Sequence, residues 1–460
     1  MMLKNIFVSP QKNVSFFFAF ILFLASFFAS IIIPPLSSPD EWAHVERAYL
    51  FSQGQIVLHT PANNLSGGMV DTGLLIYLNS FSKYPFHTDK KISEKDYDII
   101  KKISWSGKKV FSVSAGTGFY FPVIYFPQAT GLTIGRWLNF SVDKSYKISR
   151  FFSQFSIFLI IFSSFYLFTP NLTVISLLIL PMSIFQASAS SLDGMSTAIT
   201  ILVLSCFFRI FQEKKNVSLT LIIFLNISIT LLITSRLHAF PLLSLVFAAY
   251  LLTKKQICLW MGCITSFIGL GWTLTAIQTT VTHIPMSNPS TIDKVAHYLY
   301  HPVYLFGILY NTISNHTLEV FYTTSFLGNL GWLDTPLSNT TYCLLGFFLL
   351  FFFIFSISLE KNKELNLIRF FLFSLGFLSV FLIFFALLLT WTQPDALLID
   401  GVQGRYFLIP ALIFSYALGE KPLFQNNIPI FYFCTIILAS MYFFSNYEMI
   451  SALLHRYYIA

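Results

Sequence analysis

Long uncharged apolar runs recur along almost the whole chain, and they constrain its fold more than any other feature. A helix that crosses a bilayer needs about 20 apolar residues, and eleven runs fit this pattern. Only 10% of the residues are charged, too few to cover a water-soluble fold of this size. We predict an all-α polytopic membrane protein in which residues 1–460 form one integral membrane domain. The expected helices are 14–33, 150–169, 172–189, 193–211, 217–235, 237–253, 257–279, 341–359, 366–390, 405–419 and 428–446.

The first run follows Lys4 and Lys12, so a cleaved signal peptide is the alternative to a first helix. The run from Val14 to Ile33 is longer than the apolar part of a typical signal peptide. Two prolines follow it directly, and we expect an uncleaved helix.

Short basic clusters indicate the orientation, because short loops rich in lysine and arginine stay in the cytoplasm. With the N-terminus inside, the alternation of eleven helices puts every cluster inside and the C-terminus outside. The clusters are Lys4 with Lys12, Lys214 with Lys215, Lys254 with Lys255, Lys361 with Lys363, and Lys421.

This alternation leaves two large extracytoplasmic loops, 34–149 and 280–340. Within the first loop, Gly118 to Leu138 is apolar enough to resemble a further span. It also carries two prolines, two internal glycines and an arginine, with tyrosine and tryptophan towards its ends. We therefore expect an interfacial helix that lies on the outer membrane surface.

The basic residues outside the clusters have two interpretations. Eight lysines lie between Lys83 and Lys109, and they form either a solvated surface or a site that attracts an anionic glycan or lipid headgroup. The net charge of +8 is not a nucleic-acid signal here, since basic residues beside apolar spans reflect topology and contact with membrane lipids. The five cysteines follow no zinc or redox spacing, and no metal is expected.

A polar motif begins where the first helix ends. Ser38-Pro39-Asp40-Glu41 has the composition of a helix start, with proline and acids in the first turn. On that helix Asp40, His44 and Arg47 share one face. A carboxylate held near a cation can accept a proton from a sugar hydroxyl, whereas the alternative is helix capping and surface ion pairing.

Further polar groups map to the same side of the membrane. Asp193 lies between the third and fourth helices, and Arg236 and His238 lie between the fifth and sixth. Arg405, in Gly401-Val-Gln-Gly-Arg-Tyr-Phe407, begins the tenth helix. Each alone fits an interfacial anchor, but acids and bases are costly in lipid and together indicate a cavity. The Arg405 guanidinium could bind two phosphate oxygens.

The cytoplasmic side lacks the motifs of nucleotide chemistry. There is no G-x-x-x-x-G-K-[ST] and no H-E-x-x-H, and no cytoplasmic loop is long enough for a nucleotide-binding domain. An enzyme with this layout would need a lipid-carried donor in the outer leaflet.

A set of motifs spread over nearly the whole chain resembles a widespread bacterial polytopic family, long catalogued as a domain of unknown function, with P-D-E-x-x-H and Q-G-R-Y-F as signatures. That family is similar to the GT-C superfamily of glycosyltransferases. The size and layout are also similar to phage-borne serotype-converting glucosyltransferases that modify O-antigen. The motifs are Pro39-Asp40-Glu41-x-x-His44-x-x-Arg47-Ala48-Tyr49, Gly54, Tyr125-x-Pro127-x-Ala129-x-Gly131, Leu180-Pro181-Met182 with Gln186 and Asp193, and Val402-Gln403-Gly404-Arg405-Tyr406-Phe407.

The resemblance implies a GT-C-like fold and a reaction at the periplasmic face of the bacterial inner membrane. It implies transfer of a sugar, glucose as the first choice, from a polyprenyl phosphate to a glycan acceptor such as O-antigen in lipopolysaccharide. Asp40 matches the acidic position of these enzymes and is the first choice of base, with Glu41 second. The remaining roles are donor-phosphate binding by Arg405 and Arg236, and substrate binding by His44, Arg47, Asp193, His238, Gln403 and Tyr406.

We expect a metal-independent, inverting transfer with no cofactor other than the lipid-linked substrate. A flippase and a polyprenyl-phosphate glycosyltransferase are the expected operon partners. Two alternatives remain: a surface-polysaccharide polymerase or ligase, and a lipid-linked sugar flippase or transporter. Transporters tend to place charges near the bilayer midplane and to show inverted repeats, whereas this chain has its charges at helix ends and no visible repeat.

Overall fold

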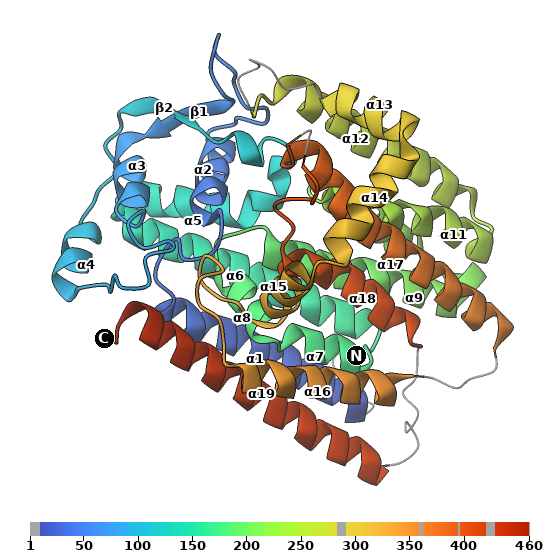
Figure 1. Cartoon of the computed structure of the whole chain (residues 1–460). Coiled ribbons are helices and arrows are strands. Elements are labelled where there is room, and N and C mark those ends of the chain that lie inside the picture. The colour runs from blue at the N-terminus through green and yellow to red at the C-terminus, as the bar shows by residue number, and fades with distance from the viewer. Residues whose placement is uncertain (1–9, 283–290, 358–361, 394–395, 420–427, 460) are drawn as a thin grey trace.

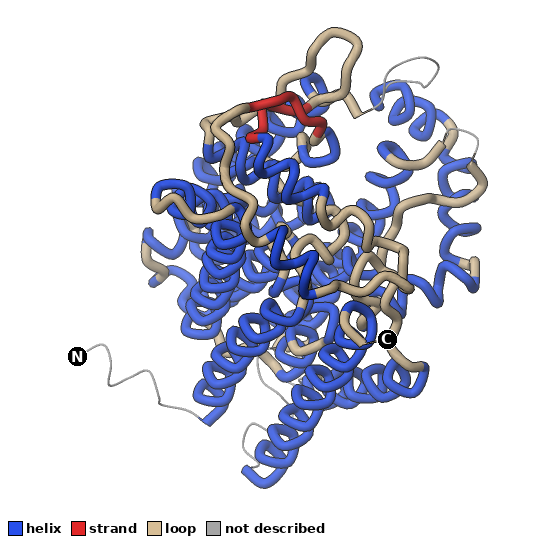
Figure 2. Tube along the Cα trace, turned by 90° about the vertical axis from the view of Figure 1, so that its left-hand side faces the viewer, coloured by secondary structure: helices blue, strands red, loops and turns tan. Residues whose placement is uncertain are grey.

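The computed structural model describes residues 10–282, 291–357, 362–393, 396–419 and 428–459. Its described part is mostly helical, and one small two-stranded sheet lies at one end of the molecule (Figures 1 and 2). The chain is therefore a multi-pass membrane protein of the predicted all-α type.

Seven helices in the described residues are long and apolar enough to cross a membrane. Each contains most of one of the predicted runs, because length and hydropathy alone locate such segments. They are α1 (Pro10–Ile32), α6 (Val142–Leu167), α9 (Asp193–Glu213, continued by the 3-10 turn η4, Lys214–Asn216), α12 (Gln256–Thr279), α16 (Asn339–Ser356), α17 (Lys363–Thr390) and α19 (Ile428–Tyr457).

The other four predicted runs do not form long α-helices. Proline explains the break in 172–189, since Pro181 starts a new helix and cannot continue the previous one. Run 217–235 gives a single helix of only 15 residues. Runs 237–253 and 405–419 each begin with a 3-10 segment. The elements are α7 (Leu172–Leu178) and α8 (Pro181–Ser188), α10 (Leu219–Ile233), η5 (Leu237–Leu243) with α11 (Ser244–Thr253), and η6 (Gly404–Phe407) with α18 (Leu408–Ala417).

Two long helices extend beyond their apolar runs. Helix α6 begins at Val142 rather than near residue 150, because Ser141 accepts a hydrogen bond from the Lys144 N–H and caps the helix. The first loop is therefore shorter than 34–149. Helix α19 continues past residue 446 to Tyr457, with His455 and Arg456 in its last turn.

The first loop folds into short helices and a two-stranded sheet. Strands β1 (Gly67–Asp71) and β2 (Lys109–Val113) pair antiparallel, with Gly67 opposite Val113. Helix α5 contains only 12 residues and packs on α6 and α2, which agrees with a surface helix rather than a span. The helical elements are α2 (Glu41–Ser52), α3 (Thr72–Asn79), α4 (Glu94–Ile100), η2 (Ala115–Thr117), η3 (Pro122–Tyr125) and α5 (Phe126–Trp137).

The second loop, 280–340, contains three short helices. They are α13 (Thr291–Tyr300), α14 (Pro302–Ile313) and α15 (His316–Leu327). Helix α15 packs against η6, which carries Arg405, and α14 packs with α17 in a second apolar cluster.

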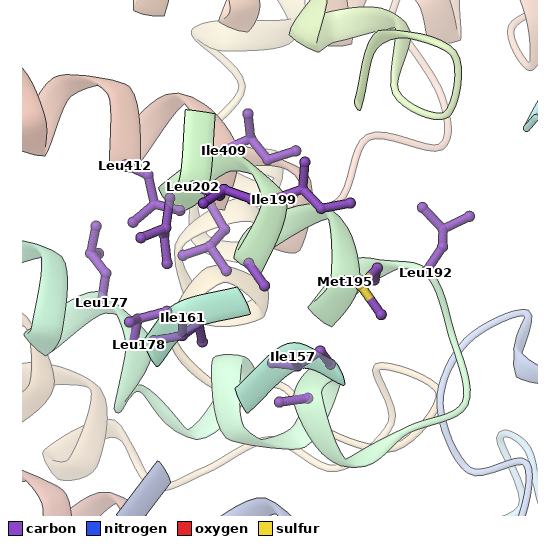
Figure 3. Packing of buried hydrophobic residues seen from close by; sticks show 14 of the residues in the cluster. Ile157, Ile161, Leu177, Leu178, Leu192, Met195, Ile199, Leu202, Ile409 and Leu412 are labelled. Carbon is purple, nitrogen blue, oxygen red and sulfur yellow. The ribbon is translucent and has the colours of Figure 1, made fainter. Parts of the chain in front are cut away.

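The main core lies where α6, α7, α9 and α18 meet. Side chains such as Ile161, Leu177, Ile199 and Leu412 interdigitate there and are almost fully buried (Figure 3). Helix α9 is the most enclosed of the seven long helices, with 94% of its apolar 18-residue stretch buried. It therefore gives Asp193, at its first residue, a fixed position.

The helix ends divide between two faces. Lys12 lies 4.5 Å from the Tyr166 ring, Lys214 pairs with Glu364, and Lys255 donates to the carbonyl of Val217. We call this side the lysine face. Lys4, Lys361 and Lys421 lie outside the described residues.

The opposite side carries both large loops, and we call it the loop face. The end of α19 lies there, since the Ile92 N–H donates to the Tyr457 carbonyl at 2.8 Å. Arg456 and Asp334 form an ion pair at 2.8 Å that ties α19 to the second loop. Helix α1 begins at the lysine face and α19 ends at the loop face, which agrees with an odd number of crossings.

Candidate functional site

Asp40 lies at the loop face, directly before α2. It has a left-handed backbone, with φ of 59°, and its side chain makes no capping hydrogen bond. This conformation is tolerated by aspartate better than by most residues, because a short polar side chain meets little steric conflict there. The side chain is 53% exposed. Asp40 is therefore an accessible carboxylate, not a helix cap.

Two arginines share one buried carboxylate beside it. Arg405 Nη1 donates to Asp193 Oδ2 at 2.5 Å, and Arg236 Nη2 pairs with Asp193 Oδ1. Arg405 Nη2 lies 3.6 Å from Asp40 Oδ2, within ion-pair range but beyond a hydrogen bond. The fold thus brings together four charged side chains from four separate segments, and the sequence predicts all four on this side of the membrane.

The motif around Arg405 fixes its guanidinium from two sides. Gln403 Oε1 accepts a hydrogen bond from Arg405 Nε at 2.6 Å, and the Tyr406 ring lies 5.2 Å from the guanidinium carbon. Gly404 approaches the backbone of α15 so closely that a Cβ there would lie 1.9 Å from the Tyr322 carbonyl oxygen. Only glycine fits this packing. The close contact with α15 therefore fixes the position of the neighbouring Arg405.

His44 forms the wall of the site next to Arg236. Its Nδ1 lies 2.7 Å from the Tyr125 hydroxyl, and its ring lies 6.0 Å from that of Tyr120. Burial lowers the pKa of His44 well below 6.5, and the charges of Arg236 and Arg405 lower it further. His44 is therefore neutral at physiological pH, and it adds a hydrogen-bonding group without charge.

Glu41 does not share the accessibility of Asp40. Its side chain is fully buried, and Oε1 accepts hydrogen bonds from the Tyr146 hydroxyl at 2.7 Å and the Ser190 N–H at 2.6 Å. Oε2 accepts from the Ser38 N–H at 3.2 Å. A carboxylate with both oxygens engaged cannot reach a substrate hydroxyl, so this geometry does not fit the base role considered for Glu41.

Arg47 and His238 are also buried, but neither forms an ion pair with the acids of the site. Arg47 Nη2 donates to the carbonyl of Ile56 at 2.6 Å and so holds the chain after α2. The His238 carbonyl accepts from Ser379 Oγ at 2.7 Å, and its Nε2 has no hydrogen-bond partner among the described residues.

Three residues of the site region escape prediction from the sequence. Tyr146 and Ser190 donate hydrogen bonds to Glu41, and the Tyr120 ring lies near His44, yet none of the three is itself a predicted site residue. The Arg236 guanidinium carbon lies 5.9 Å from the Tyr120 ring. The sequence signal for Tyr120 is weak: it is one of several aromatic residues around Pro122.

An open apolar cavity of about 610 Å³ lies on the second loop. Tyr304, Gly307 and Ile308 of α14 line it together with Leu397. Leu397 precedes Arg405 by eight residues in a segment whose Ile399 N–H donates to Thr312 of α14 at 2.9 Å. The segment that leads to Arg405 therefore also lines the cavity.

The charged groups can perform acid–base and anion-binding chemistry. An exposed carboxylate next to a buried arginine can accept a proton, and two guanidinium groups can bind an oxyanion. Across the described ranges, no group of three or more His, Cys, Asp and Glu side chains is arranged to hold a metal ion.

Comparison with known proteins gives a family. A family model described as predicted membrane protein (DUF2142) matches residues 20–414, which is most of the chain. The chain belongs to this family of membrane proteins. No match was found among curated proteins or among solved structures.

Proposed function

We propose that this member of the DUF2142 family is a GT-C-type glycosyltransferase that moves a sugar from a polyprenyl phosphate to a cell-surface glycan. The observation that carries the proposal is the exposed carboxylate of Asp40, 3.6 Å from the buried guanidinium of Arg405. An exposed carboxylate and a buried cation thus lie side by side at the loop face, which supports a base next to an anion-binding group. We take glucose as the donor sugar and O-antigen as the acceptor.

The proposed reaction needs only groups that face this site. Asp40 accepts the proton of an acceptor hydroxyl, and that oxygen attacks the anomeric carbon of the donor. The bond between this carbon and the phosphate oxygen breaks, and polyprenyl phosphate leaves. Arg405 and Arg236 stabilise the charge that develops on the leaving phosphate. Attack from the face opposite the phosphate inverts the anomeric centre.

The charge of the buried groups of the site favours an anionic donor. Arg236 and Arg405 carry two positive charges against one on Asp193, and His44 is neutral. The excess positive charge is balanced by Asp40, the one acid of this group that is exposed. A bound phosphate would take over this balance and leave Asp40 free to act as a base.

The apolar cavity beside α14 supports a lipid-linked donor. Val303 and Phe306 of the same helix are 85% and 64% exposed, and such side chains fit a lipid environment better than water. The prenyl chain would lie against α14 while its phosphate reaches Arg405. The proposed orientation has the N-terminus in the cytoplasm and the loop face in the periplasm, in the inner membrane of a bacterium.

Glycan analysis of a deletion strain tests the proposal. We expect the surface glycan to lose one sugar substituent and keep its chain length, and the wild-type gene to restore the substituent. A change in glycan length alone would instead indicate a polymerase.

The decisive variant is Asp40→Asn, because asparagine adopts the left-handed conformation of Asp40 readily and cannot accept the proton. We expect this variant to insert normally and to leave the glycan unmodified. Asp96→Asn is the matched control, since Asp96 is a half-exposed acid of the same loop that pairs with Lys83. Normal modification by Asp40→Asn would refute the proposal.

A further inference from the structure

The segment before α2 is held in an unfavourable backbone conformation. Leu36 and Asp40 have φ values of 60° and 59°, in a left-handed region that leucine in particular avoids. Such residues persist where the surrounding structure fixes them, and they concentrate at functional sites. The contacts that fix this segment therefore determine where the Asp40 carboxylate lies.

Glu41 makes the strongest of these contacts. Through Oε1 it binds the Ser190 N–H, and through Oε2 it binds the Ser38 N–H, at 2.6 and 3.2 Å. Ser190 lies three residues before Asp193. Glu41 thus joins the segment that carries Asp40 to the turn that carries Asp193.

Tyr146 and Trp332 complete the support. The Tyr146 hydroxyl donates to Glu41 Oε1 at 2.7 Å and accepts from the Leu36 N–H at 3.3 Å. Trp332 Nε1 donates to the Leu36 carbonyl at 3.0 Å. A helix of the bundle and the second loop thus both hold the segment that ends in Asp40.

We propose that Glu41 is a positioning residue that sets the distance between the Asp40 carboxylate and the Arg405–Asp193 pair. This assignment rests on the proposed role of Asp40. It gives the two adjacent acids different tasks: Asp40 faces the substrate, and Glu41 faces the protein. Hydrogen bonds to a charged acceptor are the strong ones, so Glu41 is well suited to hold a strained turn.

Two substitutions separate positioning from proton transfer. Glu41→Gln keeps an oxygen that can accept from both Ser190 and Tyr146, whereas Glu41→Ala removes every acceptor. A base would be lost equally in both variants. A positioning residue should be partly rescued by glutamine, and we expect the glutamine variant to stay within about tenfold of the wild-type rate. The alanine variant should fall about 100-fold, the effect of a displacement of about 1 Å at a reacting group.

The rate is measured in the deletion strain, as the initial rate at which modified glycan appears after induction, per amount of protein in the membrane. Tyr146→Phe should give an intermediate loss, since it removes one of the three donors to Glu41. Glu94→Gln is the control, because Glu94 is exposed at the start of α4. Equal inactivity of Glu41→Gln and Glu41→Ala would overturn the proposal, and so would wild-type rates in both.

A second measurement does not depend on transfer. A water-soluble carbodiimide labels exposed carboxyl groups, and mass spectrometry locates the label. We expect Glu41→Ala to raise the labelling of Asp40 several-fold while the buried Asp143 stays unlabelled, which distinguishes a local release from unfolding. Unchanged labelling of Asp40 would overturn the positioning role. If Asp40→Asn retains transfer, the proposed function fails, and the labelling still reports whether Glu41 holds the turn.

Discussion

Arg405 and Asp193 form a buried ion pair, with 2.5 Å between Nη1 and Oδ2, although 212 residues separate them in the sequence. Asp193 also binds Arg236, so one carboxylate compensates two guanidinium groups. The arrangement is asymmetric. Loss of either arginine leaves the acid paired, whereas loss of the acid leaves two buried cations together.

This asymmetry predicts unequal effects on stability. Asp193→Ala should lower the free energy of unfolding by about 3–5 kcal/mol, the usual cost of a buried charge without its partner. Arg405→Ala should cost about 1–2 kcal/mol, since Arg236 still pairs with Asp193. Thermal or denaturant unfolding of the purified protein in detergent measures the difference. A larger loss for Arg405→Ala than for Asp193→Ala would contradict the shared-carboxylate arrangement.

The geometry of the Arg405 guanidinium predicts that lysine cannot replace it. Arg405 binds Gln403 and Asp193 and faces Asp40 through three separate nitrogens, whereas an ammonium group is a single point charge. We expect Arg405→Lys to lower glycan modification about 100-fold, as for the loss of one preorganised donor. Arg209→Lys serves as the control, because Arg209 is half-exposed and pairs with Glu213 of the same helix. Near-normal modification by Arg405→Lys would exclude a need for the planar fork.

Much of this site could be predicted from the sequence. Hydropathy and the basic clusters assign Asp40, Asp193, Arg236 and Arg405 to one side of the membrane, and the structure brings all four together. The reason is physical: few charged residues occur in such a chain, and those at the same helix ends have little choice of partner.

Local pairing could not be predicted in the same way. The sequence ranks Asp40 before Glu41 as the base, but only the fold shows that the Glu41 side chain faces Tyr146 and Ser190. Likewise, Arg47 shares a helix face with Asp40 but binds the Ile56 carbonyl. The run 172–189 also has the length of a span, yet Pro181 divides it. Side-chain direction and helix breaks depend on contacts between distant segments, which hydropathy does not report.

The cavity beside α14 predicts an effect of chain length in the donor. A Cβ at Gly307 would meet nothing within 4 Å, so Gly307→Trp can fill the cavity without distorting the helix. If the cavity holds the prenyl chain, this variant should raise the KM of a long-chain donor about tenfold. That corresponds to about two buried methylene groups at roughly 0.8 kcal/mol each.

The comparison with a short-chain donor makes this test specific. The KM of a short-chain donor should change little in Gly307→Trp, since the short chain does not reach the filled space. Gly346→Trp is the matched control, because Gly346 on α16 also has open space around it and lies away from the cavity. Equal effects on both donors would show that the cavity does not hold the chain.

Glu46 predicts a pH dependence of stability that is separate from the reaction. Its side chain is buried on α2 and accepts hydrogen bonds from Ser112 and Ser114. Burial raises the pKa of Glu46 from 4.5 to about 7, although the two serine hydroxyls lower it in part. Between these values the folded protein binds more protons than the unfolded chain, so the free energy of unfolding falls as the pH rises.

The variant Glu46→Gln removes this dependence. It should unfold at a higher temperature than the wild type at pH 8, by a margin equivalent to about 2–3 kcal/mol. The margin should shrink as the pH falls and disappear below about 4.5, where Glu46 is protonated in both states. Glu94→Gln, at an exposed position, should show no such trend. A difference between Glu46→Gln and wild type that stays constant from pH 4 to pH 8 would contradict the raised pKa of Glu46, because the slope vanishes only where the folded and unfolded states bind the same number of protons.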